Sequence, residues 1–80
     1  MHELGLARSI AAIVAENADG RAIGVVRVAI GPLACVEQRA LHFCWGLVTE
    51  NTGLQGAELA FVAAEGDTFV VREFEFRESA

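Results

Sequence analysis

The stretch Ile23–Thr49, IGVVRVAIGPLACVEQRALHFCWGLVT, contains a strand pattern followed by a helix pattern, and the predicted fold is built around this pair. Its first part, Ile23–Ile30, alternates between two sets of side chains and is rich in β-branched residues, which predicts a β-strand. Gly31-Pro32 ends this strand, because proline has no N–H to donate to a strand ladder. From about Val36 to Thr49 the apolar residues return at helical spacing, which predicts an α-helix. A strand followed by a helix favours a right-handed crossover to a parallel strand.

The predicted second helix has one broad apolar face on a wheel of about 100° per residue. The expected apolar arc consists of Ala40, Leu41, Phe43, Cys44, Leu47 and Val48, with Trp45 at its margin. The expected polar face consists of Gln38, Arg39, His42, Gly46 and Thr49. We therefore expect His42 to point outward and Cys44 to point inward.

The flanking segments complete the fold. Glu3–Asn17 has the spacing of an amphipathic helix. Ala57–Ala64 and Thr68–Phe76 have the pattern of strands, and Glu65-Gly66-Asp67 between them predicts a hairpin loop. The order helix, strand, helix, strand, strand predicts an α+β fold, with two helices packed on one face of a three-stranded mixed sheet. We expect residues 1–80 to form a single domain of this kind.

The sheet face away from the helices is expected to be apolar. It receives Val25, Ala29, Ala60 and Val62, with Val70 if the register holds. An open apolar sheet face is unusual in a protein that acts alone, so a second copy or a partner protein is expected to cover it. The alternation therefore predicts a homo-oligomer that forms through the open sheet face.

Composition excludes several classes of function. Eleven acidic residues against six arginines give a formal charge of −5, which disfavours nucleic acid and anionic membranes as partners. No apolar run reaches the roughly 18 residues of a membrane span, and no basic region followed by an apolar run opens the chain, which predicts a cytoplasmic protein. Cys35 and Cys44 are expected to be reduced thiols. No catalytic constellation is present in the sequence, so we do not expect an enzyme.

The N-terminal tripeptide Met1-His2-Glu3 is the candidate for chemistry. A terminal amine, neighbouring backbone amides and the His2 imidazole can form fused chelate rings, and Ni(II) and Cu(II) prefer such tetragonal nitrogen sets. The alternative is that His2 is an ordinary terminal residue without a ligand.

Several blocks of the chain carry a resemblance to a known family. They are MHELGLARSI at 1–10, VAIGPL at 28–33, Val36-Glu37, ALHF at 40–43, Val48-Thr49 and GAEL at 56–59. The chain resembles the HypA/HybF family of nickel-insertion accessory proteins for nickel–iron (NiFe) hydrogenases. The family fold, two helices against a three-stranded sheet, agrees with the pattern above.

The resemblance implies a nickel metallochaperone that delivers Ni(II) during hydrogenase maturation. It implies that His2 binds the metal and that Met1 and Glu3 supply amine or amide nitrogens. Glu37 is a further candidate near the metal, although an acidic residue in the first turn of a helix is also explained by the helix dipole. The implied partners are the NiFe-hydrogenase large-subunit precursor and the GTPase HypB.

The family also carries a zinc lobe between its last two strands, and this chain has a short turn at 64–67 in that place. We therefore expect no zinc here. Because the lobe is missing, an alternative function stays open. The chain would then be an interaction module, or an assembly or structural subunit derived from the HypA fold, that binds no metal.

Overall fold

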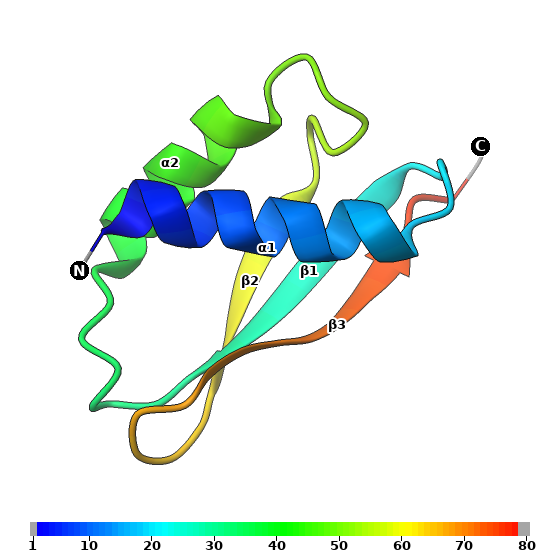
Figure 1. The fold of residues 1–80 in the computed structure, drawn as a ribbon. Helices are drawn as coiled ribbons and strands as arrows, with labels where there is room; N and C mark the ends of the chain where they lie inside the picture. Colours follow the sequence, from blue (N-terminus) through cyan, green and yellow to red (C-terminus); the bar gives the residue numbers. More distant parts are fainter. Residues whose placement is uncertain (1, 79–80) are drawn as a thin grey trace.

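The computed structural model describes residues 2–78 and contains two helices and three strands in the predicted order (Figure 1). The elements are α1 (Glu3–Asn17), β1 (Ile23–Ile30), α2 (Gln38–Thr49), β2 (Glu58–Ala63) and β3 (Phe69–Phe76). The predicted bounds of α1 and β1 are confirmed. The helix α2 begins at Gln38 rather than Val36, because Glu37 is extended and occupies the N-cap position.

The sheet has the order β2-β1-β3, so β1 lies in the middle. The strand β2 runs parallel to β1, as the crossover predicts, and β3 runs antiparallel to β1. The expected hairpin between the last two strands is wrong, because β2 and β3 lie on opposite sides of β1. β3 pairs with the second edge of β1, and the outer edge of β2 carries no strand among the described residues.

The connection between β2 and β3 crosses the end of β1. It is hydrogen-bonded to the residues that directly follow β1. Gly31 donates its N–H to the carbonyl of Thr68 at 2.8 Å, and Leu33 donates to the carbonyl of Gly66 at 2.8 Å. Ala64 donates in turn to the carbonyl of Ile30 at 3.1 Å. These bonds hold the short turn against the end of β1, so the backbone of the turn lies very close to Gly31.

Gly31 has no room for a side chain. A Cβ built there would lie 2.2 Å from the carbonyl oxygen of Gly66 and 2.6 Å from that of Glu65, and both are backbone atoms. We expect Gly31→Ala to destabilise the fold by about 1–3 kcal/mol, as overpacking does. The control is Gly46→Ala in α2, where nothing lies within 4 Å of the added methyl group. That variant is expected to gain about 0.5–1 kcal/mol from helix propensity. Urea denaturation of both variants measures the difference, and equal midpoints would contradict this account.

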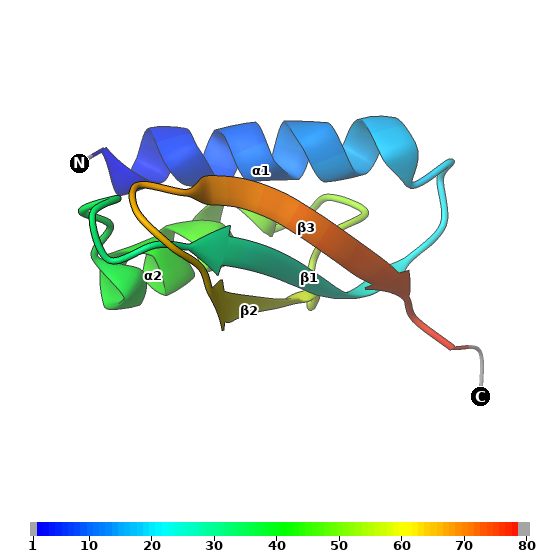
Figure 2. The same ribbon diagram turned by 90° about the horizontal axis from the view of Figure 1, so that it is seen from below.

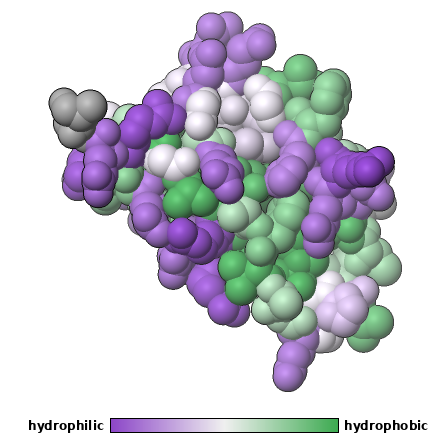
Figure 3. All heavy atoms as spheres, turned by 180° about the vertical axis from the view of Figure 1, so that it is seen from behind, coloured by the Kyte–Doolittle hydropathy of each residue, from purple (hydrophilic) through white to green (hydrophobic). Residues whose placement is uncertain are grey.

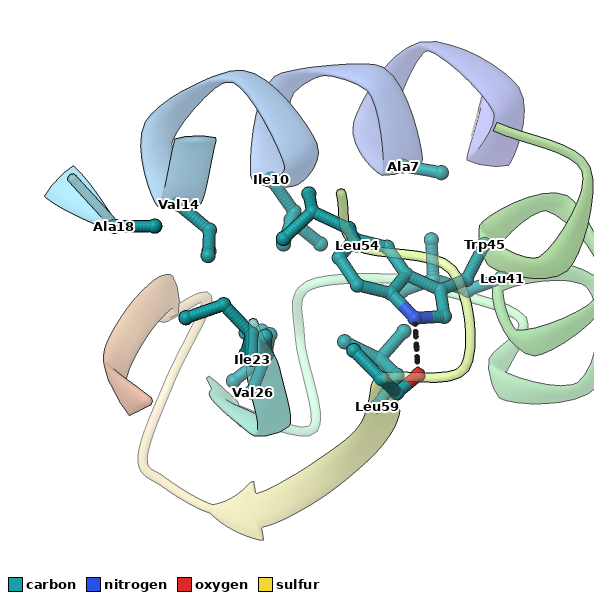
Figure 4. Packing of buried hydrophobic residues seen from close by; sticks show 12 residues of the cluster. Ala7, Ile10, Val14, Ala18, Ile23, Val26, Leu41, Trp45, Leu54 and Leu59 are labelled. Carbon is teal, nitrogen blue, oxygen red and sulfur yellow. Dashed lines mark hydrogen bonds between the residues drawn. The ribbon is translucent and has the colours of Figure 1, made fainter. Parts of the chain in front are cut away.

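Both helices contribute to one hydrophobic core on one side of the sheet (Figures 1 and 2). Figure 4 shows the close packing of side chains from α1, α2 and the strands. The buried cluster consists of Ala7, Ile10, Val14, Ala18, Ile23, Val26, Val28, Leu41, Trp45, Leu54, Ala57 and Leu59. The predicted α+β architecture is therefore confirmed.

The buried side of α2 differs from the predicted arc. Leu41, Trp45 and Thr49 are buried, whereas Phe43 and Leu47 are 69% and 54% exposed. The indole N–H of Trp45 donates to the carbonyl of Ala57 at 2.9 Å (Figure 4), which gives its polar atom a partner inside the core. Thr49 is tolerated there because its hydroxyl donates to the Trp45 carbonyl at 2.8 Å.

His42 is exposed, as the helical wheel predicts, but its ring also contacts the neighbouring strand β2. Its ring stacks on Phe61 of β2 with centroids 4.8 Å apart and 17° between the planes. Its Nε2 lies 2.7 Å from the carbonyl oxygen of Leu59, at hydrogen-bonding distance. His42 thus joins α2 to β2. The expectation for Cys44 holds in part, since it is half-buried against the core.

The open sheet face is less apolar than predicted. Arg27 lies in its middle and forms ion pairs with Glu73, at 2.7 Å, and Glu75 on β3. Val25 lies between Glu58 and Glu75, and Ala60 lies beside Arg27. The purely apolar part is the end where Ala29 is paired with Val62 on one side and Val70 on the other. Figure 3 shows the face opposite α1, with hydrophobic residues gathered toward the β2–β3 connection and hydrophilic residues beside them. In the described part of the chain, no helix combines the length and the apolar character needed to cross a membrane.

Candidate metal centre at the start of α1

The start of α1 carries the histidine that the sequence singles out. His2 is the N-cap residue, with φ −89° and ψ 85°, and it is exposed. Its carbonyl accepts the N–H of Leu6 at 3.0 Å, but its side chain makes no capping hydrogen bond. The imidazole is therefore not engaged in capping the helix, and it stands next to backbone amides at the positive end of the helix dipole.

Glu3 ties this end of α1 to the start of α2, and Figure 1 shows the two helix ends side by side. Its Oε2 accepts the backbone N–H of Glu37 at 3.1 Å, across 34 residues of sequence. This hydrogen bond is the main cause that lowers the pKa of the Glu3 carboxyl from its usual 4.5. Because the pKa is lowered in the folded protein, the contact stabilises the fold above about pH 4.5, and its contribution is lost as the pH falls through the lowered value.

Glu37 serves as the N-cap of α2. Its Oε1 accepts the N–H of Arg39 at 2.9 Å, and its own N–H is the one that Glu3 accepts. The cap supports the explanation of Glu37 as a residue at the positive end of a helix, which needs no metal. Glu3 and Glu37 are thus brought together, through a backbone group of one and a carboxylate of the other.

The side chains of the described residues do not by themselves form a metal cluster. Within residues 2–78, no group of three or more histidine, cysteine, aspartate or glutamate side chains is placed to hold a metal ion. Met1, the remaining predicted ligand, lies outside the described residues. Cys35 is exposed and Cys44 half-buried, and both are free thiols. The candidate ligands at this end of α1 are the His2 imidazole and the main-chain nitrogens beside it, a set that suits Ni(II).

A comparison with known protein families identifies the chain. The family model described as hydrogenase/urease nickel incorporation, metallochaperone, hypA, matches residues 1–70. The chain belongs to the HypA family. The match includes α1, α2 and the whole candidate centre.

Individual HypA relatives agree with the family match. A hydrogenase maturation factor HypA from Trichodesmium erythraeum is 44% identical over 66 residues, which are 82% of this chain and 58% of the relative. The HypA of Crocosphaera subtropica is 38% identical over 66 residues, which are 82% of this chain and 58% of the relative. The HypA of Geotalea daltonii is 42% identical over 59 residues, which are 74% of this chain and 54% of the relative. The chain therefore spans little more than half the length of these relatives.

One feature of the centre has no signal in the sequence. The contact from Glu3 to the backbone of Glu37 joins positions 34 residues apart, and the acceptor is a side chain whose partner is a main-chain group. Helix-dipole reasoning explains an acidic residue at either position, but it does not pair them. The tertiary packing of α1 beside α2 makes the pair.

Proposed function

We propose that this chain is a nickel metallochaperone, which binds Ni(II) at its N-terminus and delivers it during NiFe-hydrogenase maturation in the cytoplasm. The observation that carries the proposal is the family match, because it covers residues 1–70 and so includes the N-terminal segment. The relatives are hydrogenase maturation factors HypA, which supports the same role. In this role nickel is cargo, and the chain catalyses no reaction.

The proposed ligands are the His2 imidazole, the Met1 amine and backbone nitrogens at Glu3, and no zinc site is proposed. A backbone amide binds nickel as an anion, and the positive end of the α1 dipole favours a negative charge there. The exposed His2 side chain, which makes no capping bond, anchors the metal beside these nitrogens. Glu37 is proposed as a carboxylate near the metal, and its observed contact is the capping of α2.

The proposed partners are the NiFe-hydrogenase large-subunit precursor and the GTPase HypB. We infer further that residues 1–80 act as one nickel-binding domain, with the turn at 64–67 in place of the zinc lobe of the family. The hydrogen bonds from Gly31 and Leu33 to this connection support that inference, since they close it against β1.

The direct test of the proposal blocks the N-terminal amine. Protein with extra residues before Met1 is expected to bind Ni(II) at least about tenfold more weakly than protein with a free amine, a difference of about 1.4 kcal/mol. The extension converts the amine to an amide and removes one nitrogen ligand. Titration calorimetry measures the affinity, and the same extension placed after Ala80 serves as the control. Equal binding by the two extended proteins would exclude the amine as a ligand.

A second candidate function is an interaction module or assembly subunit that binds no metal. The observation that favours it is the outer side of α2, where Phe43 and Leu47 are 69% and 54% exposed. Such side chains are typical of surfaces that meet another protein. For such a module, blocking the amine leaves the activity in the cell unchanged, whereas for a nickel carrier it abolishes hydrogenase maturation.

We propose also that the chain self-associates through the apolar end of the open sheet face. Val62 lies beside the fully buried Ala29 in the sheet register. Val62→Glu is expected to give a folded monomer, because a carboxylate buried at the contact would lack a partner. Sedimentation velocity measures the mass, and Leu33→Glu, at a loop position that is 70% exposed, is the control. A parent chain that is monomeric at high concentration would contradict the proposal.

A further inference from the structure

The carboxylate of Glu3 is already used by the protein itself. Its Oε2 accepts the N–H of Glu37 at 3.1 Å, so the first residue of α1 is held against the N-cap of α2. Glu3 also directly follows His2, and its own backbone nitrogen belongs to the proposed nickel ligands. Glu3 therefore has its main chain at the proposed nickel site and its side chain bonded to the start of a neighbouring helix.

We propose that Glu3 is a positioning residue for nickel and that its carboxylate does not bind the metal. This inference rests on the proposed function, nickel binding at the N-terminus. The side chain holds the first turn of α1 in one place, and the main-chain nitrogens beside His2 are thereby held in the geometry that the metal requires.

Two physical arguments support this role. The ends of a chain are ordinarily poorly ordered, and ordering the backbone of one residue costs roughly 1–2 kcal/mol. A contact that orders the segment beforehand removes part of this cost from the binding step. A carboxylate suits the task, because it lies between the positive ends of two helix dipoles and accepts a charge-assisted hydrogen bond.

If Glu3 positions the site, two Glu3 variants should differ in nickel affinity, whereas both should bind weakly if its carboxylate were a ligand. Glu3→Gln keeps a side-chain oxygen that accepts the Glu37 N–H, whereas Glu3→Ala removes the acceptor. We expect Glu3→Gln to bind Ni(II) within about threefold of the parent, whereas Glu3→Ala should bind about 10–100-fold more weakly, the range seen when an outer-shell partner is lost. Glu16→Ala, which removes an exposed carboxylate at the other end of α1, is the control and is expected to bind like the parent.

The experiment combines calorimetry with two readouts that do not depend on affinity. The visible absorption bands of bound nickel should stay at the same wavelengths in both Glu3 variants, because the ligand atoms are unchanged. The Glu37 amide proton should exchange with solvent faster in Glu3→Ala than in the parent or in Glu3→Gln. Thermal unfolding of each variant verifies that it is folded.

The outcomes are distinct for the inference and for the proposed function. If Glu3→Gln is as weak as Glu3→Ala and its absorption bands shift, the carboxylate is a ligand and the inference is wrong. If Glu3→Ala binds like the parent, positioning by Glu3 is wrong as well. If the parent binds no nickel, or if it binds and loses nothing on His2→Ala, the proposed N-terminal site fails, and the inference fails with it.

Discussion

His2→Ala is expected to lower the affinity for Ni(II) by more than the roughly 10–100-fold that loss of an outer-shell partner costs. The imidazole is the side-chain nitrogen of the proposed site, and it closes the chelate ring with the backbone amides. Backbone amides bind Ni(II) only after they lose their protons. Without the imidazole, no side-chain ligand holds the metal beside the amides during this deprotonation. The measurement is calorimetric titration of protein without a tag, at fixed pH.

The matched control is the other histidine of the chain. His42 is stacked on Phe61, and its Nε2 lies 2.7 Å from the Leu59 carbonyl oxygen, so His42→Ala should leave nickel binding unchanged. The affinity of the parent should also fall as the pH drops below neutrality, because protons compete with the metal for nitrogen ligands. Unchanged binding in His2→Ala, or a loss that follows His42 instead, would remove His2 from the site.

Trp45→Ala is expected to destabilise the fold by about 3–5 kcal/mol, which is the usual cost of removing a large buried aromatic side chain. Trp45 is 4% exposed, and its indole N–H is bonded to the Ala57 carbonyl. The variant therefore opens a cavity and leaves a buried acceptor without its partner. The expected loss is a large share of the total, since domains are typically stable by only about 5–15 kcal/mol. Urea denaturation, followed by far-UV circular dichroism, measures it.

Phe43→Ala is the control for this prediction, because Phe43 is two residues away on the same helix and 69% exposed. We expect a change within about 0.5 kcal/mol. The conservative variant Trp45→Phe separates the two contributions, and the lost hydrogen bond should cost about 1–3 kcal/mol. If Phe43→Ala lowers the free energy of unfolding as much as Trp45→Ala does, the side of α2 described as buried is wrong.

The candidate site was predictable only in part. The N-terminal tripeptide suggests a nitrogen chelate without help from the fold, because the ligands are adjacent in the chain. The helix dipole predicts acidic residues at Glu3 and Glu37, but the hydrogen bond between them depends on α1 lying beside α2. The open sheet face shows the same limit. Alternation places Val25 and Ala29 on one face, yet the β3 register is what brings Glu73 and Glu75 to Arg27.

Local sequence patterns were enough to predict the helices and strands and their order along the chain. The bounds of α1 and β1 follow from local patterns, because the periods of 3.6 and 2 residues are properties of neighbouring positions. The parallel pairing of β2 with β1 follows from the handedness of a strand–helix–strand unit.

The buried side of α2 and the strand that neighbours β3 depend on tertiary packing. On the wheel, Phe43 and Trp45 are both apolar, and burial selects Trp45 because the Ala57 carbonyl meets its indole N–H. The turn signal between β2 and β3 is equally compatible with a hairpin and with the observed crossing past Gly31. Both choices depend on hydrogen-bond partners far away in the chain, and a local pattern carries no information about such partners.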